Sequence, residues 1–207
     1  MTPRNHRRGL GLIAMLCGWL AASPSHAHPH VWIDYHLTVL FEAGHIIALQ
    51  QDWSFDEDFS TTALHDLGRR PGATAALTEN EITALHDKAF INLRNYEYFI
   101  HVWSNGVAVK PAKDASHFSA SIQGPALRYH FTVPLTKPVD PRQSAVSIGL
   151  WDDSYYVDVG PALDGPAITL SGTGSEHCQG NLAEDPSHPI YYGGVIPKVV
   201  KITCKGE

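Results

Sequence analysis

An alternation of polar and apolar side chains near the start of the chain is the feature that most restricts its fold. From residue 28 the sequence reads HPHVWIDYHLTV, and every second residue from Val31 to Val39 is apolar or aromatic. Successive side chains of a β-strand point to opposite faces, so this period predicts a strand with one face in a core. The core face would hold Val31, Ile33, Tyr35, Leu37 and Val39, and the other face His28, His30, Trp32, Asp34 and His36.

More strands and at least one helix follow along the chain. Residues 45–53 come after Ala43-Gly44 and predict a hairpin, and Asn-Gly between residues 96–103 and 107–110 predicts a second one. Between the hairpins, Thr78 and Glu81 form a capping box before a helical pattern of apolar residues. Further strand-like segments are 126–135, 144–152 and 154–159. We therefore expect an α+β fold, with an antiparallel, β-rich, sandwich-like body and a helical insertion near 56–94.

The first 27 residues have the pattern of an export signal. Three arginines lie within the first eight residues, an apolar run covers residues 9–22, and small residues precede a cut after Ala27. The apolar run is shorter than the roughly 20 residues that span a membrane. We expect a signal peptide at 1–27 and a single periplasmic domain at 28–207, not embedded in the membrane after cleavage.

The charge of the processed chain argues against two classes of partner. Removing 27 of the 207 residues leaves 180 and takes away three basic residues and no acidic one, so the formal net charge moves from −6 to −9. Such an acidic chain is not expected to bind nucleic acid or an anionic membrane surface. It suits a protein that attracts cations.

The cysteines of the processed chain predict a disulfide. Cys17 leaves with the signal, and Cys178 and Cys204 remain. Two cysteines in an exported protein usually pair, which here would pin the C-terminal tail. The alternative is a thiolate metal site made of His177, Cys178 and His188, although this spacing matches no standard zinc pattern.

The new N-terminus is a candidate metal ligand. A cut after Ala27 would give His28 a free α-amine beside its imidazole, with His30 two residues away. Neutral imidazole suits zinc, nickel, cobalt and copper, and the sequence does not choose among them. Pro29 has no amide hydrogen, so a square-planar chelate through that peptide is excluded. The alternative is that these histidines belong to the solvated side of a strand.

Acidic residues after the second strand would complete such a site. Asp56 and Asp58 in the segment WSFDEDFS are candidate oxygen donors, although acidic residues are also ordinary at a helix start. Asp153 lies in LWDDSYYVDV, where Asp152-Asp153 is alternatively a tight turn. The residues that we expect to line the site are Trp32, Asp34, Trp53, Asp153 and Tyr155.

Four stretches in this order resemble a known family. HPHVWID, DWSFDEDFS, NYEYFIHVW and DDSYYVDV are similar to the bacterial domain of unknown function 1007 family, over residues 28 to about 158. The family is described as the periplasmic component of an uncharacterised ABC-type transport system, and its members often accompany nickel/cobalt exporters or zinc-responsive operons. The resemblance implies a metal-handling role and an inner-membrane metal transporter as partner.

One departure from the family pattern concerns calcium. Similar proteins often carry an EF-hand-like loop before the long helix. With Leu77 and Glu81 at positions 8 and 12 of that loop, Arg70, Gly72 and Thr74 stand at positions 1, 3 and 5. Calcium needs oxygen ligands at these positions, and an arginine would repel the ion. Glu81 is better explained as a helix cap, and no calcium is expected.

Three functions follow from these observations. The favoured one is a periplasmic accessory protein that binds a divalent transition metal, zinc, nickel or cobalt, for a transport system. The alternatives are a periplasmic solute-binding or scaffold protein without a metal, and a copper-dependent redox enzyme. The sequence has no G-x-S-x-G and no H-E-x-x-H, and no cysteine is left as a nucleophile, so we do not expect an enzyme.

Overall fold

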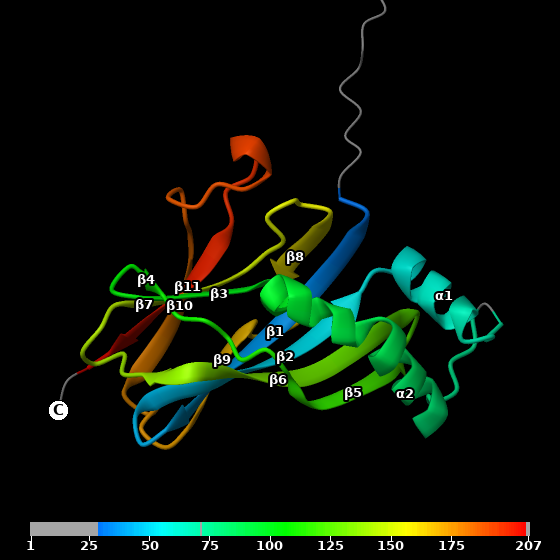
Figure 1. Cartoon of the computed structure of the whole chain (residues 1–207), viewed down its shortest axis with the longest axis horizontal. Coiled ribbons are helices and arrows are strands. Elements are labelled where there is room, and N and C mark those ends of the chain that lie inside the picture. The colour runs from blue at the N-terminus through cyan, green and yellow to red at the C-terminus, as the bar shows by residue number, and fades with distance from the viewer. Residues whose placement is uncertain (1–28, 71, 206–207) are drawn as a thin grey trace, which may run out of the picture.

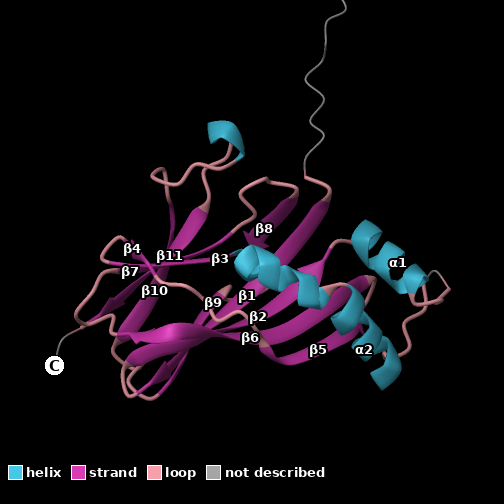
Figure 2. Cartoon of the chain, viewed as in Figure 1, coloured by secondary structure: helices cyan, strands magenta, loops and turns pink. Residues whose placement is uncertain are grey.

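The computed structural model describes residues 29–70 and 72–205. The expected signal peptide and His28 lie outside these residues. Two sheets share one hydrophobic core, and two helices lie beside the first sheet (Figures 1 and 2). Strands dominate, which confirms the α+β, β-rich prediction. Among the described residues, no helix has both the length and the apolar character needed to cross a bilayer.

The first sheet has six strands. Its order is β5-β6-β2-β1-β8, and β9 also pairs with β1. The strands are β1 (Val31–Glu42), β2 (His45–Phe55), β5 (Ser116–Gln123), β6 (Ala126–Val139), β8 (Val157–Pro161) and β9 (Ile168–Gly172). The predicted hairpin is confirmed, because β1 and β2 pair antiparallel with Tyr35 opposite Trp53. The pairings of β8 and β9 with β1 are parallel, which the sequence patterns did not predict.

The second sheet has five strands in the order β10-β11-β7-β3-β4. They are β3 (Ile100–Ser104), β4 (Val107–Ala108), β7 (Val146–Leu150), β10 (Cys178–Glu184) and β11 (Lys198–Cys204). Every pairing in this sheet is antiparallel. The hairpin at Asn105-Gly106 is confirmed, although β4 is only two residues long.

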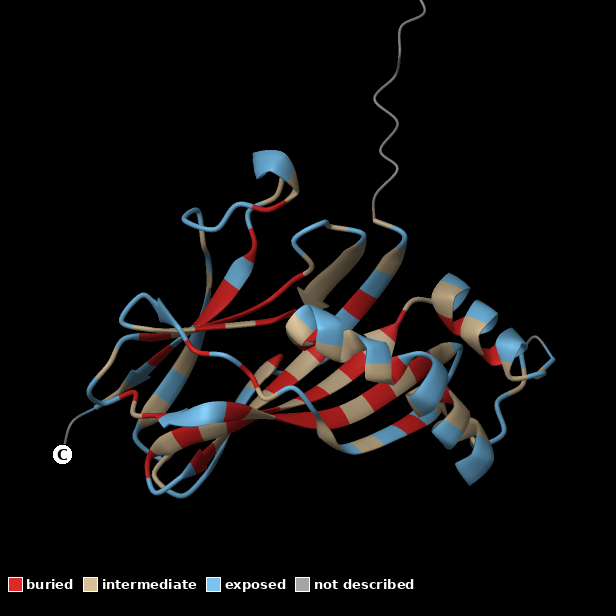
Figure 3. Ribbon diagram, viewed as in Figure 1, coloured by how far each residue is buried: buried red, intermediate tan, exposed pale blue. Residues whose placement is uncertain are grey.

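The alternation predicted for β1 is present. Ile33, Tyr35, Leu37 and Val39 are at most 2% exposed, whereas Trp32 is 48% exposed. Buried residues alternate with more exposed ones along most of β1 and β2 (Figure 3). The period of two therefore fixed both the strand and the side of the sheet that faces the core.

The helical insertion covers the core side of the first sheet. It comprises α1 (Glu57–Asp66), α2 (Glu79–Lys88) and the 3₁₀ segment η1 (Phe90–Phe99). Leu64, Leu85 and Phe90 belong to the same core as residues of both sheets. The capping box at Thr78 and Glu81 begins α2 as predicted.

A left-handed turn occupies positions where the sequence predicted a strand. Glu97, Tyr98 and Phe99 have φ angles of 51°, 54° and 58°, so the prediction of a strand from Tyr96 is wrong, and β3 begins at Ile100. Three successive residues other than glycine in this region are strained, and surrounding contacts must hold them. The Tyr98 hydroxyl makes two of these contacts: it donates a hydrogen bond to the carbonyl of residue 113 and accepts one from the amide of residue 115.

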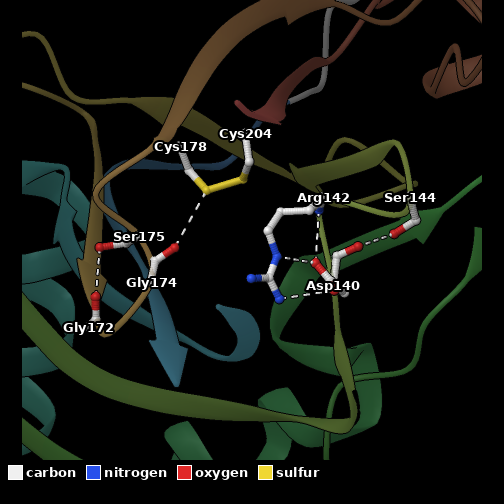
Figure 4. The surroundings of a disulfide bond; sticks show 8 residues. All are labelled: Asp140, Arg142, Ser144, Gly172, Gly174, Ser175, Cys178 and Cys204. Atoms are coloured by element: carbon white, nitrogen blue, oxygen red, sulfur yellow. Dashed lines mark hydrogen bonds and ion pairs between the residues drawn. A yellow bond between two sulfur atoms is a disulfide. The ribbon is translucent and has the colours of Figure 1, made fainter. Parts of the chain in front are cut away.

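The C-terminal tail is pinned by a disulfide. Cys178 and Cys204 stand opposite each other on β10 and β11 and are bonded (Figure 4). The predicted pairing is confirmed, and the alternative of Cys178 as a thiolate ligand is wrong because its sulfur is already bonded. The bonded cysteines lie at one end of the β10–β11 pair, which extends over residues 178–184 of β10.

Candidate functional site

His30 stands where the chain enters β1. Its backbone amide donates to the carbonyl of Tyr156 at 2.9 Å, and the two rings lie 4.7 Å apart between centroids. The residue itself is exposed. The start of the described chain is therefore held against the segment just before β8, with the imidazole at the surface.

Asp56 ties the same strand to α1. One carboxylate oxygen accepts from the amide of Trp32 at 2.8 Å, and the other accepts from the amide of Phe59 at 2.9 Å, as an N-cap. The amide of Asp56 in turn donates to the carbonyl of Trp32 at 3.0 Å. The helix-cap reading of Asp56 is therefore correct for the described structure. Each oxygen keeps a further lone pair for another ligand.

The loop between β7 and β8 (151–156) is organised by its own acidic residues. The Asp152 carboxylate accepts from the amides of Ser154, Tyr156 and Val157. Asp153 accepts from the indole of Trp151 at 3.0 Å. Asp152 thus shapes a turn, as the alternative interpretation of this pair proposed.

Three of the sequence stretches that carry the family resemblance touch in this region, and the fourth, residues 95–103, contacts Trp151, the residue just before DDSYYVDV. His30 contacts Tyr156, Trp32 pairs with Asp56, and the amide of Trp151 donates to the carbonyl of Phe99 at 3.0 Å. The strained turn at 97–99 therefore supports the loop. Figure 1 shows the start of β1 and the loop before β8 at the same end of the sheet.

The remaining predicted residues divide between surface and core. Trp32 is exposed and stands opposite Asp158 in the register of β1 and β8, and Asp58 is exposed in the first turn of α1. The Tyr155 hydroxyl donates to Asp158 at 3.2 Å. Trp53 is fully buried and donates from its indole to Gln51 at 2.6 Å, so it lies in the core and not at the surface that carries Trp32.

The pKa of Asp34 reflects the negative charge of this surface. Partial burial raises the pKa of its carboxyl, the negative charges of Asp164 and Asp158 raise it further, and His36 opposes them. Neighbouring carboxylates that disfavour each other's charge make a surface that attracts a cation.

Two imidazole–carboxylate pairs on the solvent face of the first sheet were not singled out from the sequence. His36 contacts Asp164 at 2.9 Å, and His130 contacts Asp52 at 2.6 Å. The second ring nitrogen of His36 lies 3.3 Å from the carbonyl of Pro166. Both ring nitrogens of His36 therefore already have an oxygen neighbour, which makes this ring a poor metal ligand. The partners come from distant segments, which no local spacing reveals.

A candidate metal site at His30 is only partly described. No three histidine, cysteine, aspartate or glutamate side chains within residues 29–70 and 72–205 are grouped closely enough to hold a metal ion. The described part offers the His30 imidazole and the carboxylates of Asp56 and Asp58 at the start of α1, which are donor types that suit zinc, nickel, cobalt or copper. His28 and the α-amine predicted for it lie outside this part.

An arginine holds the segment that leads into α2. Arg69 donates to both oxygens of Glu81, at 2.6 and 2.9 Å, and to the carbonyls of Ala75 and Ala76. Hydrogen bonds from Arg69, and then from Thr78, lower the pKa of Glu81 to about 2. The Glu81 carboxylate and the two backbone carbonyls therefore already bind a positive group, the guanidinium of Arg69.

The relatives of this chain are uncharacterised proteins. An uncharacterised protein of Haemophilus influenzae is 28% identical over 159 residues, which cover 76% of this chain and 73% of the relative. An uncharacterised 15.5 kDa protein in the trpE 3′ region of Spirochaeta aurantia is 29% identical over 128 residues, which cover 60% of this chain and 87% of the relative. The family described as "Protein of unknown function (DUF1007)" matches residues 13–191, and the chain therefore belongs to this family.

Proposed function

We propose that this protein is a periplasmic accessory protein that binds a divalent transition metal through its processed N-terminus. His28 and His30 would be the nitrogen ligands, and Asp56 or Asp58 would supply oxygen. The observation that carries the proposal is the position of His30, which is exposed and anchored by Tyr156, two residues before Trp32, whose amide donates to Asp56.

The surroundings of His30 support a cationic ligand. Asp158 stands opposite Trp32, and the pKa of Asp34 is raised first by burial and then by neighbouring carboxylates. A metal ion would be attracted to this negative surface. The exposed Trp32 and Tyr156 would shield one side of it, while the terminal position leaves the other side open.

A site at a chain end suits delivery. A terminal amine, two imidazoles and a carboxylate would fill the four positions of a tetrahedral zinc site, so transfer would begin when the chain end releases one of its donors. The protein would thus pass the metal to or from an inner-membrane transporter of the ABC-type system that the family resemblance implies. No catalytic step is needed for this role.

Two observations support a periplasmic location. The sequence begins with a pattern typical of an export signal. The Cys178–Cys204 disulfide is of the kind that persists in oxidising compartments.

Calorimetric titration with zinc tests the ligand role of His30. We expect a His30→Ala variant of the processed protein to bind zinc at least tenfold more weakly than the wild type. A matched His65→Ala variant should bind as the wild type does, because His65 is an exposed histidine on α1, outside the proposed site. Equal affinity in all three proteins would contradict the proposal.

A further inference from the structure

A pocket of about 200 Å³ lies between the two sheets. One wall is the edge strand β8, and the other is formed by the end of β7 and the segment that leads into β11. Apolar side chains predominate in the lining, among them Leu150, Val157, Val159, Ile190 and Val195. An apolar cavity of about 150 Å³ is large enough to bind benzene, so this pocket can hold a single aromatic ring.

Tyr35 of β1 brings a polar group to this pocket. The residue is 2% exposed, and it lines the pocket from the strand next to β8. Its hydroxyl makes no hydrogen bond to any residue within 29–70 and 72–205. In the same part of the chain, the side-chain atoms that are completely enclosed without a partner are Gln51 Nε2 and Tyr129 Oη. The Tyr35 hydroxyl also lacks a partner but is not enclosed in this way, so it remains in contact with the pocket that the residue lines.

The Tyr35 hydroxyl is a hydrogen-bond donor that the fold leaves uncommitted. Burial raises the pKa of this phenol to about 12, so it keeps its hydrogen at neutral pH. The other two polar aromatic side chains of the lining are already engaged: the Tyr155 hydroxyl donates to Asp158 at 3.2 Å, and the Trp151 indole donates to Asp153 at 3.0 Å. A ligand in the pocket would therefore meet a free donor at Tyr35 and mostly apolar walls elsewhere.

We propose that this pocket binds a small, neutral molecule of about one aromatic ring, whose oxygen acceptor takes the hydrogen of the Tyr35 hydroxyl. The apolar walls favour a body that loses its contact with water. The acceptor takes the place of the water that would otherwise solvate the hydroxyl. The charged residues of the lining, Asp158 and Lys198, have opposite signs, and a charged ligand would also have to leave water to enter.

Two ligands of the same shape test the hydrogen bond. Acetophenone carries a carbonyl oxygen where α-methylstyrene carries a CH₂ group, and each is titrated into the processed wild type and into a Tyr35→Phe variant, with backbone amide shifts followed by NMR. We expect shifts at Leu150, Val159 and Val195. Tyr35→Phe should weaken acetophenone binding about fivefold to tenfold, the worth of one net hydrogen bond, and should not weaken α-methylstyrene binding.

The comparison cancels the different hydrophobicity of the two ligands, because each ligand is compared with itself across the substitution. An equal effect of Tyr35→Phe on both ligands would overturn the proposal. Failure of acetophenone to bind the wild type, or shifts only at residues away from the pocket, would overturn it as well.

Tyr155→Phe is the matched control. It removes a hydroxyl from the same pocket, but one that already donates its hydrogen to Asp158, so acetophenone binding should be nearly unchanged. The melting temperature separates a ligand role of Tyr35 from a structural one. Tyr35→Phe should melt at the wild-type temperature or above it, because the lost hydroxyl has no partner in the fold. A variant that melts well below the wild type would contradict the proposal.

Charged analogues test the class of ligand. Benzoate and benzylammonium keep the ring and carry one negative or one positive charge, and we expect each to bind at least about tenfold more weakly than acetophenone. Tighter binding of benzoate would mean that Lys198 selects an anion, and tighter binding of benzylammonium that Asp158 selects a cation. Either result would overturn the assignment of a neutral ligand.

Discussion

Trp53 and Gln51 lie on β2 and hydrogen-bond with each other inside the core. The Trp53 indole donates to Gln51 at 2.6 Å, and both side chains are 0% exposed. From the sequence, a tryptophan beside an acidic segment looked like the wall of a metal site. The period of two along β2 instead places it on the inner face, stacked at 5.9 Å against Phe99. Local proximity in sequence misled because neighbouring strand residues face opposite ways.

Trp53→Phe should therefore act on stability. The smaller ring leaves a cavity, and the Gln51 side-chain carbonyl loses the Trp53 indole as its donor, so we expect a loss of about 2–4 kcal/mol in the free energy of unfolding. Urea unfolding would measure this loss as a lower midpoint concentration, with the dependence of the unfolding free energy on urea concentration unchanged.

A double variant provides the control for that experiment. In Gln51→Leu/Trp53→Phe neither polar group is left buried, and the Gln51 amide nitrogen already lacks a partner within the described residues. The double variant should be more stable than Trp53→Phe alone. If it is less stable, the hydrogen bond is not the reason for the loss.

At the scale of elements, local signals predicted the first hairpin and the start of α2. Ala43-Gly44 and the Thr78–Glu81 capping box are short-range devices, and both are present. The left-handed turn at 97–99 has no such signal, because none of its residues is glycine or asparagine. The parallel pairing of β8 and β9 with β1 joins segments more than 100 residues apart, which periodicity does not reveal.

The start of α2 should show a specific dependence on acid. The folded-state pKa of Glu81 is lowered to about 2, whereas an unfolded glutamate titrates near pH 4.3. Its contribution to stability is thus full above about pH 4.3 and is lost as the pH falls toward 2. Arg69→Ala should lower the melting temperature at pH 7. On acidification, this variant should lose less stability than the wild type does.

Arg70→Ala is the matched control for this element. Arg70 is the exposed neighbour of Arg69, so its removal should leave both the melting temperature and the acid dependence nearly unchanged. Asp140, whose pKa Arg142 also lowers to about 2, titrates in the same range in every variant and cancels in the comparison. Parallel acid-unfolding curves for wild type and Arg69→Ala would contradict the role given to Glu81.

For the whole molecule, the sequence predicted the class of fold and the disulfide. It did not predict which distant segments meet, as His30 and Tyr156, Trp32 and Asp56, or Phe99 and Trp151 do. These contacts form only when the strands pair, and local sequence patterns do not show them.

The disulfide should stabilise the molecule as a whole. It closes a loop with a sequence separation of 26, for which the chain-entropy estimate is about 3.5 kcal/mol. A Cys178→Ser/Cys204→Ser variant should lose about this much free energy of unfolding, measured with denaturant. Reduction of the wild type should give a similar loss, and no change in either case would show that the pairing of β10 with β11 suffices.

The most direct test of the proposed function compares zinc binding by two processed proteins. One begins at His28, and the other carries a single additional alanine before it, which moves the α-amine away from the imidazole. We predict that the extension weakens binding at least tenfold while leaving the fold and melting temperature unchanged. Equal zinc affinity in the two proteins, or none in either, would contradict an N-terminal metal site.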